Sequence, residues 1–163
     1  MKNIILFFRK VLIVFGLLVL TSAIIGKLYE YYSDGAVQLR MSEESGLYYV
    51  PLKVNGVEME FTLDTGCSSM QMSRYDMLKL KNLNVISYDD YVGETEATDA
   101  DGNKTICQVY NIDEIDIGGY KVRNINCAVS ESENAMMLIG QELFVNFSKI
   151  TIDYENDLLF LNK

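Results

Sequence analysis

The sequence contains no histidine among its 163 residues. Without an imidazole, the usual Ser-His-Asp and Cys-His catalytic arrangements and every histidine-based metal site are excluded. The three cysteines, Cys67, Cys107 and Cys127, lie too far apart for a zinc-binding pattern, and none belongs to a Cys-x-x-Cys motif. Tryptophan is also absent and Pro51 is the only proline, but these two features exclude little. The side chains left for chemistry are carboxylates, hydroxyls, thiols and lysines.

Positive charge is scarce as well, with 14 basic against 23 acidic residues and a net charge of −9. Residues 1–27 hold four of the basic residues and no acidic one, so residues 28–163 carry a net charge of −13. A domain this acidic is a poor candidate for binding nucleic acid or anionic lipid. Glu94 and Glu96 are interpreted as solvated strand residues rather than metal ligands, because no further ligands converge on them. We therefore expect no metal and no cofactor.

The basic N-terminal segment contains an uncharged, largely apolar run at residues 11–26. Its length is slightly below the roughly 20 residues that a spanning helix needs, but Arg9 and Lys10 can reach the membrane interface. Basic residues before the run place the N-terminus in the cytoplasm and the rest of the chain outside it. We predict a transmembrane anchor at residues 1–27 and a linker at residues 28–36. The alternative is a cleaved signal peptide, with a weak cleavage site at residues 21–23, which would make the domain secreted.

Residues 37–163 have the pattern of an all-β domain with one or two short helices. Residues 47–54 and 57–63 alternate apolar and polar side chains around Asn55-Gly56, a strong signal for a type I′ hairpin. Further hairpins are predicted at 92–109, with a polar tip around Asp101-Gly102, at 110–129, and at 149–161. An edge strand is expected at 37–41, a buried strand at 136–139, and short helices at 73–80 and 141–147. Leu78, Leu80, Leu83 and Val85 are expected to pack beneath the first of these helices. About eight or nine short strands in this length imply a closed or sandwich-like β domain.

The most unusual stretch follows the second strand of the first hairpin. Asp64 comes directly after an apolar run ending in Phe61 and Leu63, and it is followed by Thr65 and Gly66. A carboxylate is rarely buried without a partner, and Gly66 permits a tight turn. An ordinary strand-to-turn boundary, in which Asp64 bonds its own backbone, would also explain the pattern. The tripeptide alone therefore does not decide between catalysis and structure.

Three features occur together in order: the Asp64-Thr65-Gly66 loop, a polar-tipped hairpin, and an apolar pair before a glycine at Leu138-Ile139-Gly140. This combination resembles the retropepsin-like aspartic proteases, and most of all the small bacterial members that carry an N-terminal membrane segment. The resemblance covers roughly residues 37–163. It implies a closed retropepsin-like β-barrel that hydrolyses peptide bonds in peptide or protein substrates.

The resemblance assigns roles to single residues. Asp64 would be the catalytic acid, Thr65 would hydrogen-bond across the base of two paired loops, and Gly66 would give the turn. The loop would be supported by Leu138, Ile139 and Gly140, and a flap tip would be formed by Ala100, Asp101, Gly102 and Asn103. Cys67 stands where the family usually has alanine or serine. Because the chain has one Asp-Thr-Gly, a working site requires a homodimer that contributes Asp64 twice.

Alternatives from other classes remain open at this point. The domain could be a catalytically silent barrel that binds extended peptides by strand addition, or a membrane-tethered structural protein in which Asp64 only caps a loop. Cys107 and Cys127 could form a disulfide outside the cytoplasm or remain two buried free thiols.

Overall fold

The computed structural model describes residues 16, 19–25, 37–99 and 101–163 of the chain, and every element below lies within them. The chain divides into two units, Met1–Ala36 and Val37–Lys163, which are described separately. In the first unit the described residues are helical and their side chains are exposed. No helix in the described part of the chain is both long enough and apolar enough to span a membrane. Most of the predicted anchor at residues 1–27 and all of the predicted linker at residues 28–36 lie outside the described residues.

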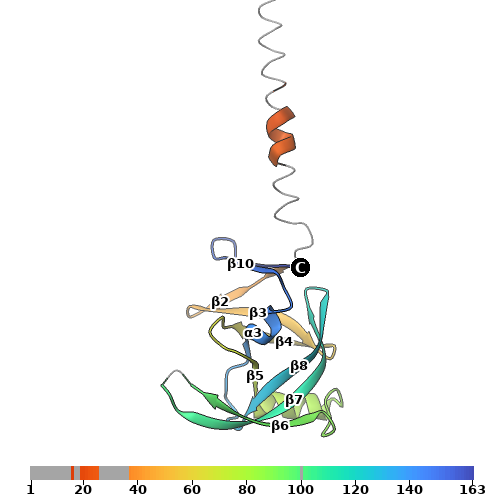
Figure 1. Cartoon of the computed structure of the whole chain (residues 1–163), viewed down its shortest axis with the longest axis vertical. Coiled ribbons are helices and arrows are strands. Elements are labelled where there is room, and N and C mark those ends of the chain that lie inside the picture. The colour runs from red at the N-terminus through yellow and green to blue at the C-terminus, as the bar shows by residue number, and fades with distance from the viewer. Residues whose placement is uncertain (1–15, 17–18, 26–36, 100) are drawn as a thin grey trace, which may run out of the picture. The chain divides into compact units, whose positions relative to one another are not determined.

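The second unit consists of strands with two short helices among its described residues (Figure 1). The strands are β1 (Val37–Arg40), β2 (Ser42–Glu44), β3 (Leu47–Val54), β4 (Val57–Leu63), β5 (Met70–Ser73), β6 (Tyr91–Thr98), β7 (Lys104–Ile117), β8 (Tyr120–Ser130), β9 (Leu138–Ile139), β10 (Lys149–Asp153) and β11 (Leu158–Asn162). The helices are α2 (Arg74–Asn82) and α3 (Gln141–Phe144). The prediction of a mainly β domain with one or two short helices is confirmed.

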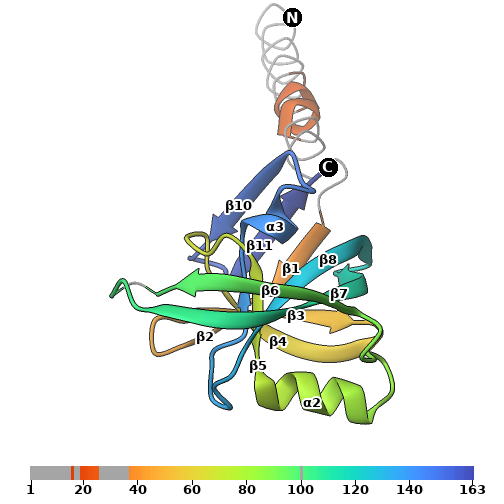
Figure 2. The ribbon, with the colours of Figure 1, turned by 60° about the horizontal axis from the view of Figure 1, so that its bottom comes forward.

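The strands form two sheets. The larger sheet has the order β2-β3-β4-β9-β5-β8-β7-β6, and the smaller has the order β1-β11-β10. An additional antiparallel pairing of β3 with β7, at Lys53↔Asp116 and Val54↔Ile115, closes the larger sheet on itself. The β6–β7 hairpin continues beyond this closed part and projects from the body of the domain (Figure 2). The predicted closed barrel is therefore present, with a long hairpin attached to it.

The β3–β4 hairpin follows directly from its sequence. Asn55 and Gly56 both have positive φ, at 46° and 85°, as a type I′ turn requires. The side chain of Asn55 also fixes the turn to its surroundings, because it donates to Val85 O at 2.7 Å and accepts from Glu114 N at 3.0 Å. Alternate residues of both strands are buried, namely Val50, Leu52, Val54, Met59 and Phe61. The hairpin thereby delivers the end of β4 to the centre of the core.

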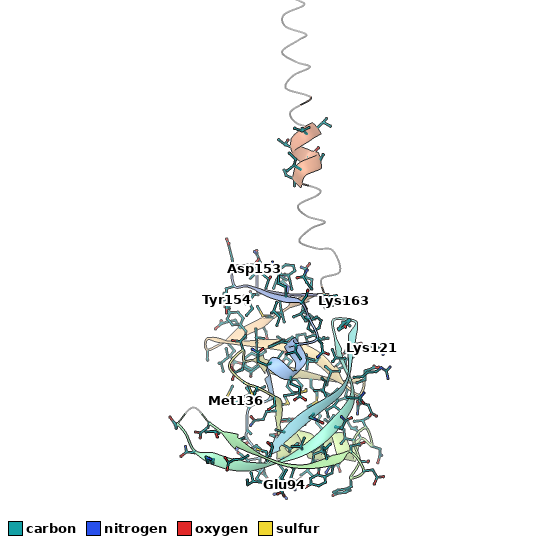
Figure 3. All side chains as sticks on the ribbon, in the orientation of Figure 1. Glu94, Lys121, Met136, Asp153, Tyr154 and Lys163 are labelled. Atoms are coloured by element: carbon teal, nitrogen blue, oxygen red, sulfur yellow. The ribbon has the colours of Figure 1, made fainter. Side chains whose placement is uncertain are left out.

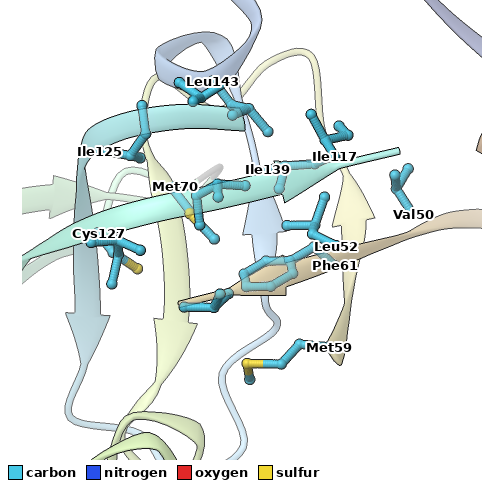
Figure 4. Packing of buried hydrophobic residues seen from close by; sticks show 14 of the residues in the cluster. Val50, Leu52, Met59, Phe61, Met70, Ile117, Ile125, Cys127, Ile139 and Leu143 are labelled. Atoms are coloured by element: carbon cyan, nitrogen blue, oxygen red, sulfur yellow. The ribbon is translucent and has the colours of Figure 1, made fainter. Parts of the chain in front are cut away.

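The core lies inside the closed sheet, and α3 covers one end of it (Figure 4). Its largest fully buried side chains include Phe61 from β4, Met70 from β5, Ile117 from β7, Ile139 from β9 and Leu143 from α3. Burying an aliphatic or aromatic side chain of this size contributes about 1.5–3 kcal/mol relative to leaving it exposed. The residues that flank the Asp64 loop thus belong to the most strongly packed part of the domain.

Two strands were not expected from the sequence, and one expected strand is shorter. Ser42–Glu44 and Met70–Ser73 form β2 and β5, which raises the strand count above the predicted eight or nine. The strand expected at 136–139 is reduced to Leu138–Ile139. Met136, labelled in Figure 3, is 48% exposed, so the apolar run does not predict burial at that position.

Helix α2 begins as predicted but packs through different residues. Ser73 caps it, accepting a hydrogen bond from Asp76 N at 3.0 Å. Leu80 is fully buried as expected, but Leu78 and Leu83 are 44% and 52% exposed. The prediction that these two leucines pack beneath the helix is wrong, because Met77 and Leu80 already occupy its buried face.

The three cysteines are free thiols. Cys127 lies opposite Tyr110 in the β7–β8 ladder, whereas Cys107 lies three positions before Tyr110 in β7, opposite Thr95 of β6. The structure therefore favours the free thiols over the disulfide. Burial raises the pKa of the Cys127 thiol far above its ordinary value, with a smaller contribution from the negative charge of Glu142.

Candidate active site

Asp64 is positioned by the pairing of two strands that are distant in sequence. β4 runs parallel to β9, with Thr62 opposite Leu138 and Leu63 opposite Ile139. The next backbone N–H, that of Asp64, donates to Ile139 O at 3.1 Å. Leu138 and Ile139 therefore lie against the start of the loop.

Beyond this point the chain forms a tight turn around the Asp64 carboxylate. Asp64 Oδ1 accepts from Gly66 N at 2.9 Å, and Asp64 O accepts from Cys67 N at 3.2 Å. The Asp64 side chain is half-buried, while Thr65 and Gly66 are exposed. One carboxylate oxygen is thus held within the loop, and the outer face of the loop is open to a ligand or a second chain.

The other face of the loop rests on Gly140 and the first turn of α3. A Cβ at Gly140 would lie 2.2 Å from Cys67 O, so only glycine fits there. Gln141 N donates to Cys67 O at 2.9 Å and Glu142 N donates to Ser68 O at 3.1 Å. The side chain of Gln141 adds a bond from Nε2 to Thr65 O at 2.7 Å. These contacts hold the Asp64 loop rigidly against the core.

A cleft of about 600 Å³ separates the Asp64 loop from the β6–β7 hairpin. On one side it is lined by residues 66–69 of the loop, and on the other by residues 95–98 of β6. The hairpin thus faces the Asp64 loop across the cleft. The tip residues Asp101, Gly102 and Asn103 are exposed and are not among the residues lining the cleft, and Ala100 lies outside the described residues.

The tip of the hairpin is organised by Asp99. Its carboxylate accepts from Asp101 N at 3.0 Å, from Asn103 N at 2.8 Å and from Asn103 Nδ2 at 2.9 Å. These hydrogen bonds lower the pKa of Asp99, and the bond from the Asn103 side chain makes the largest contribution. Gly102 has a φ of 84°, which accounts for glycine at this turn position. The tip is therefore a defined turn and not merely a polar loop.

The root of the same hairpin is fastened to α2 by Lys81. Its Nζ donates to Tyr110 OH at 2.8 Å and lies 4.1 Å from the ring centroids of both Tyr88 and Tyr110. Tyr91 packs edge-on against Tyr110, with 5.6 Å between ring centroids. Cation–π contacts and a charge-assisted hydrogen bond thus join α2 to β7, and the Tyr91–Tyr110 ring contact links β7 to the start of β6.

The structure brings Asp64, Thr65, Gly66, Leu138, Ile139 and Gly140 together in one site. Sequence reasoning missed Gln141 and Glu142, although both directly follow Gly140. It also missed the polar residues of β6 and β8 that line the cleft. The only available signal was the adjacency of Gln141 to a glycine expected to touch the loop. A helix N-terminus placed there offers unpaired N–H groups to the loop carbonyls.

Other parts of the described surface carry less chemistry. A larger cavity of about 820 Å³ is lined by residues such as Leu52, Met59 and Gly118, and it contains none of the predicted site residues. In the described part of the chain, no three His, Cys, Asp or Glu side chains are grouped so that they could hold a metal ion. The Asp64 loop and its cleft therefore remain the candidate site.

Comparison with known proteins places this geometry in a family. The family model of the gag-polyprotein putative aspartyl protease matches residues 50–146, which include the Asp64 loop, the hairpin and Gly140. The chain belongs to this aspartyl protease family. The predicted retropepsin-like relationship is confirmed, and the family and the fold support aspartic protease activity.

A solved structure agrees with this assignment. The chain is similar to a retropepsin-like aspartic protease from Rickettsia conorii, with a TM-score of 0.56 and 24% sequence identity. The match covers 78% of this chain and 89% of that one, and it shows the retropepsin-like fold. A search of curated proteins gave no match.

Proposed function

We propose that the chain is an aspartic endopeptidase whose catalytic acid is Asp64. The observation that carries the proposal is the held loop: Asp64 ends a buried strand, Gly140 and α3 fix the loop from behind, and a cleft opens beside it. A loop with only a structural role would not need an exposed outer face next to a cleft. Precise positioning of a reacting group can contribute much of an enzyme's rate enhancement.

The chemistry requires two carboxylates around one water molecule. One ionised carboxylate takes a proton from the water, while a protonated one donates a hydrogen bond to the substrate carbonyl. Two carboxylates about 3 Å apart cannot both ionise, so such a pair shares one proton, as is known for aspartic proteases in general. The apparent pKa values then belong to the pair and not to either residue.

This chain has a single Asp-Thr-Gly sequence, so the second carboxylate must come from another copy. We propose an isologous homodimer in which two Asp64 loops meet across a twofold axis. The exposure of Thr65 and Gly66 supports this proposal, because a partner loop needs access to that face. In such a dimer Thr65 of each chain would hydrogen-bond to the loop of the other.

The test uses the full-length chain, solubilised in detergent, with a mixture of peptides. We expect cleavage by the unaltered chain and at least a thousandfold loss in the Asp64→Asn variant, since removing one member of a catalytic unit typically costs about this much or more. The melting temperature and the molar mass of the variant should stay unchanged. Cleavage by Asp64→Asn at the unaltered rate would refute the proposal, and binding of peptides without cleavage would favour the silent barrel.

The organisation of the rest of the chain is also a proposal. Residues 1–27 would anchor the protein, residues 28–36 would link the anchor to the protease domain at 37–163, and that domain would lie outside the cytoplasm. The basic residues before the apolar run support this orientation. Anchoring would confine the chains to a plane and favour dimerisation. Protease accessibility of the domain in intact cells, compared with lysed cells, tests the orientation.

A further inference from the structure

The cleft between the Asp64 loop and the β6–β7 hairpin has an unusual lining for a site that binds peptides. Most of its side chains are hydroxyls, amides or carboxylates, and the largest apolar one is a valine. Among the described residues of the lining there is no aromatic ring and no basic side chain. The lining residues are Gly66, Cys67, Ser68, Ser69, Gln71, Thr95, Glu96, Ala97, Thr98, Val109, Asn126, Ala128 and Glu142. A large apolar substrate side chain would desolvate these polar groups without giving them partners, which is costly.

Two carboxylates line this cleft, and they differ in their surroundings. Glu96 is neutralised by Lys104, whose Nζ lies 2.6 Å from Glu96 Oε1. Glu142 forms no ion pair within the described residues. No cationic side chain of the described residues therefore pairs with this carboxylate at the wall of the cleft.

Glu142 is also held in place. Its backbone N–H donates to Ser68 O at 3.1 Å, which ties it to the Asp64 loop. Its Oε1 accepts from Asn126 N of β8 at 3.0 Å, which fixes the carboxylate. The described residues place no donor on the second oxygen, Oε2, which leaves it available to a ligand. A carboxylate oriented in this way resembles the fixed charge of a specificity pocket rather than a mobile surface side chain.

We propose that this cleft is a substrate subsite for a lysine or arginine side chain, with Glu142 as the residue that selects it. The inference rests on the proposed peptidase function and names its substrate class. A cationic side chain would form a charge-assisted hydrogen bond with Glu142, and its remaining donors would reach the hydroxyls and amides of the lining. The net charge of −13 on residues 28–163 would attract the same substrates at longer range.

The first experiment measures cleavage by the full-length chain. A peptide library identifies the position near the scissile bond at which lysine or arginine is preferred, and a peptide pair then compares arginine with citrulline, its uncharged isostere, at that position. We expect kcat/KM to be about tenfold higher for arginine, the effect of one charge-assisted hydrogen bond. Glu142→Gln keeps an acceptor for Asn126 N but loses the charge, so the discrimination should disappear. Glu133→Gln, at an exposed loop position outside the cleft, should retain it.

The second experiment separates this inference from the proposed catalysis. Binding of the same two fluorescent peptides is measured with the Asp64→Asn variant, which should bind without cleaving. Tighter binding of the arginine peptide, lost when Glu142→Gln is added, supports the subsite even if no cleavage is ever seen. The subsite proposal is overturned if both peptides bind equally well. It is also overturned if the variant prefers large apolar side chains and Glu142→Gln does not change that preference.

Discussion

Replacing Gly140 by alanine should disturb the Asp64 loop more than the same change at Gly66, the glycine within the loop. The added Cβ would lie 2.2 Å from Cys67 O, 2.8 Å from Cys67 C and 3.0 Å from Ser69 O. All three are backbone atoms, so they cannot rotate away as the end of a side chain could. Gly140 has φ −130° and ψ −158°, an extended conformation that any residue adopts. The penalty is therefore steric and not conformational.

The magnitude follows from this overlap. Forcing an extra carbon into a well-packed region costs about 1–3 kcal/mol. The lower entropy of the unfolded alanine chain offsets about 0.4–1 kcal/mol of this. A net loss of about 1–2 kcal/mol lowers the melting temperature of a domain of this size by roughly 4–10 °C. If the loop instead moves by about 1 Å to relieve the clash, the rate of cleavage should fall about a hundredfold.

Thermal unfolding, at one fixed chain concentration, and peptide cleavage measure the two effects. The matched control is Gly66→Ala, whose Cβ would lie 3.3 Å from Asp64 Oδ1, a side-chain atom that can shift by a few tenths of an ångström. We expect its melting temperature to fall by less than half as much. A Gly140→Ala variant with the melting temperature and cleavage rate of the unaltered chain would show that α3 does not press on the loop.

Three further predictions concern the hairpin and the thiols. Lys81→Met removes the Lys81 contacts between α2 and the hairpin root, and it should lower the free energy of unfolding by about 1–2 kcal/mol in denaturant titrations. Lys79→Met, two residues away, should change the free energy of unfolding by less than about 0.5 kcal/mol, as is usual for surface substitutions. Equal losses in the two variants would show that the Lys81 contacts do not fasten the hairpin. Hydrogen bonds lower the pKa of Asp99 below its ordinary value of 3.8. The Asp99 carboxylate therefore stabilises the hairpin tip fully above pH 3.8, and this stabilisation is lost as the pH falls through the lower pKa of the folded state. NMR titration of the tip amides should show this transition, and Asp99→Ala should abolish the transition. Half-buried Cys67 should react with a maleimide in the native state. Cys127, whose pKa is raised by burial, should react only after unfolding. Labelling of Cys127 in the native state, detected by mass spectrometry, would contradict its burial.

Local signals in the sequence were sufficient where neighbouring residues determine the structure. The Asn55-Gly56 turn and the alternation on either side predicted β3 and β4 at their observed bounds. The Asp99–Asn103 region was predicted as a polar tip because it holds a turn sequence and no large apolar residue. A short helix was predicted to begin at residue 73, and α2 begins at Arg74 with Ser73 as its cap.

Long-range pairing was not available from the sequence. β5 pairs in parallel with β8, more than fifty residues away, and the short apolar–polar alternation of its four residues, Met70–Ser73, does not indicate which strand it pairs with. Thr62 occupies a polar position in the alternation, yet it is buried because β9 lies alongside the end of β4. For the same reason the contacts of Gln141 and Glu142 with the loop, seventy or more residues apart, emerged only in the structure.

The central claim is that two copies of Asp64 form one site. Subunit mixing tests it most directly: a fixed amount of the unaltered chain is equilibrated with increasing Asp64→Asn chain, and peptide cleavage is measured after each addition. If both carboxylates are needed, unaltered chains become trapped in inactive mixed dimers. With random pairing at a ninefold excess of the variant, roughly one unaltered chain in ten has an unaltered partner, so the activity should fall to roughly one tenth. Activity that stays constant as the variant is added would show that each chain cleaves alone, and would contradict the account.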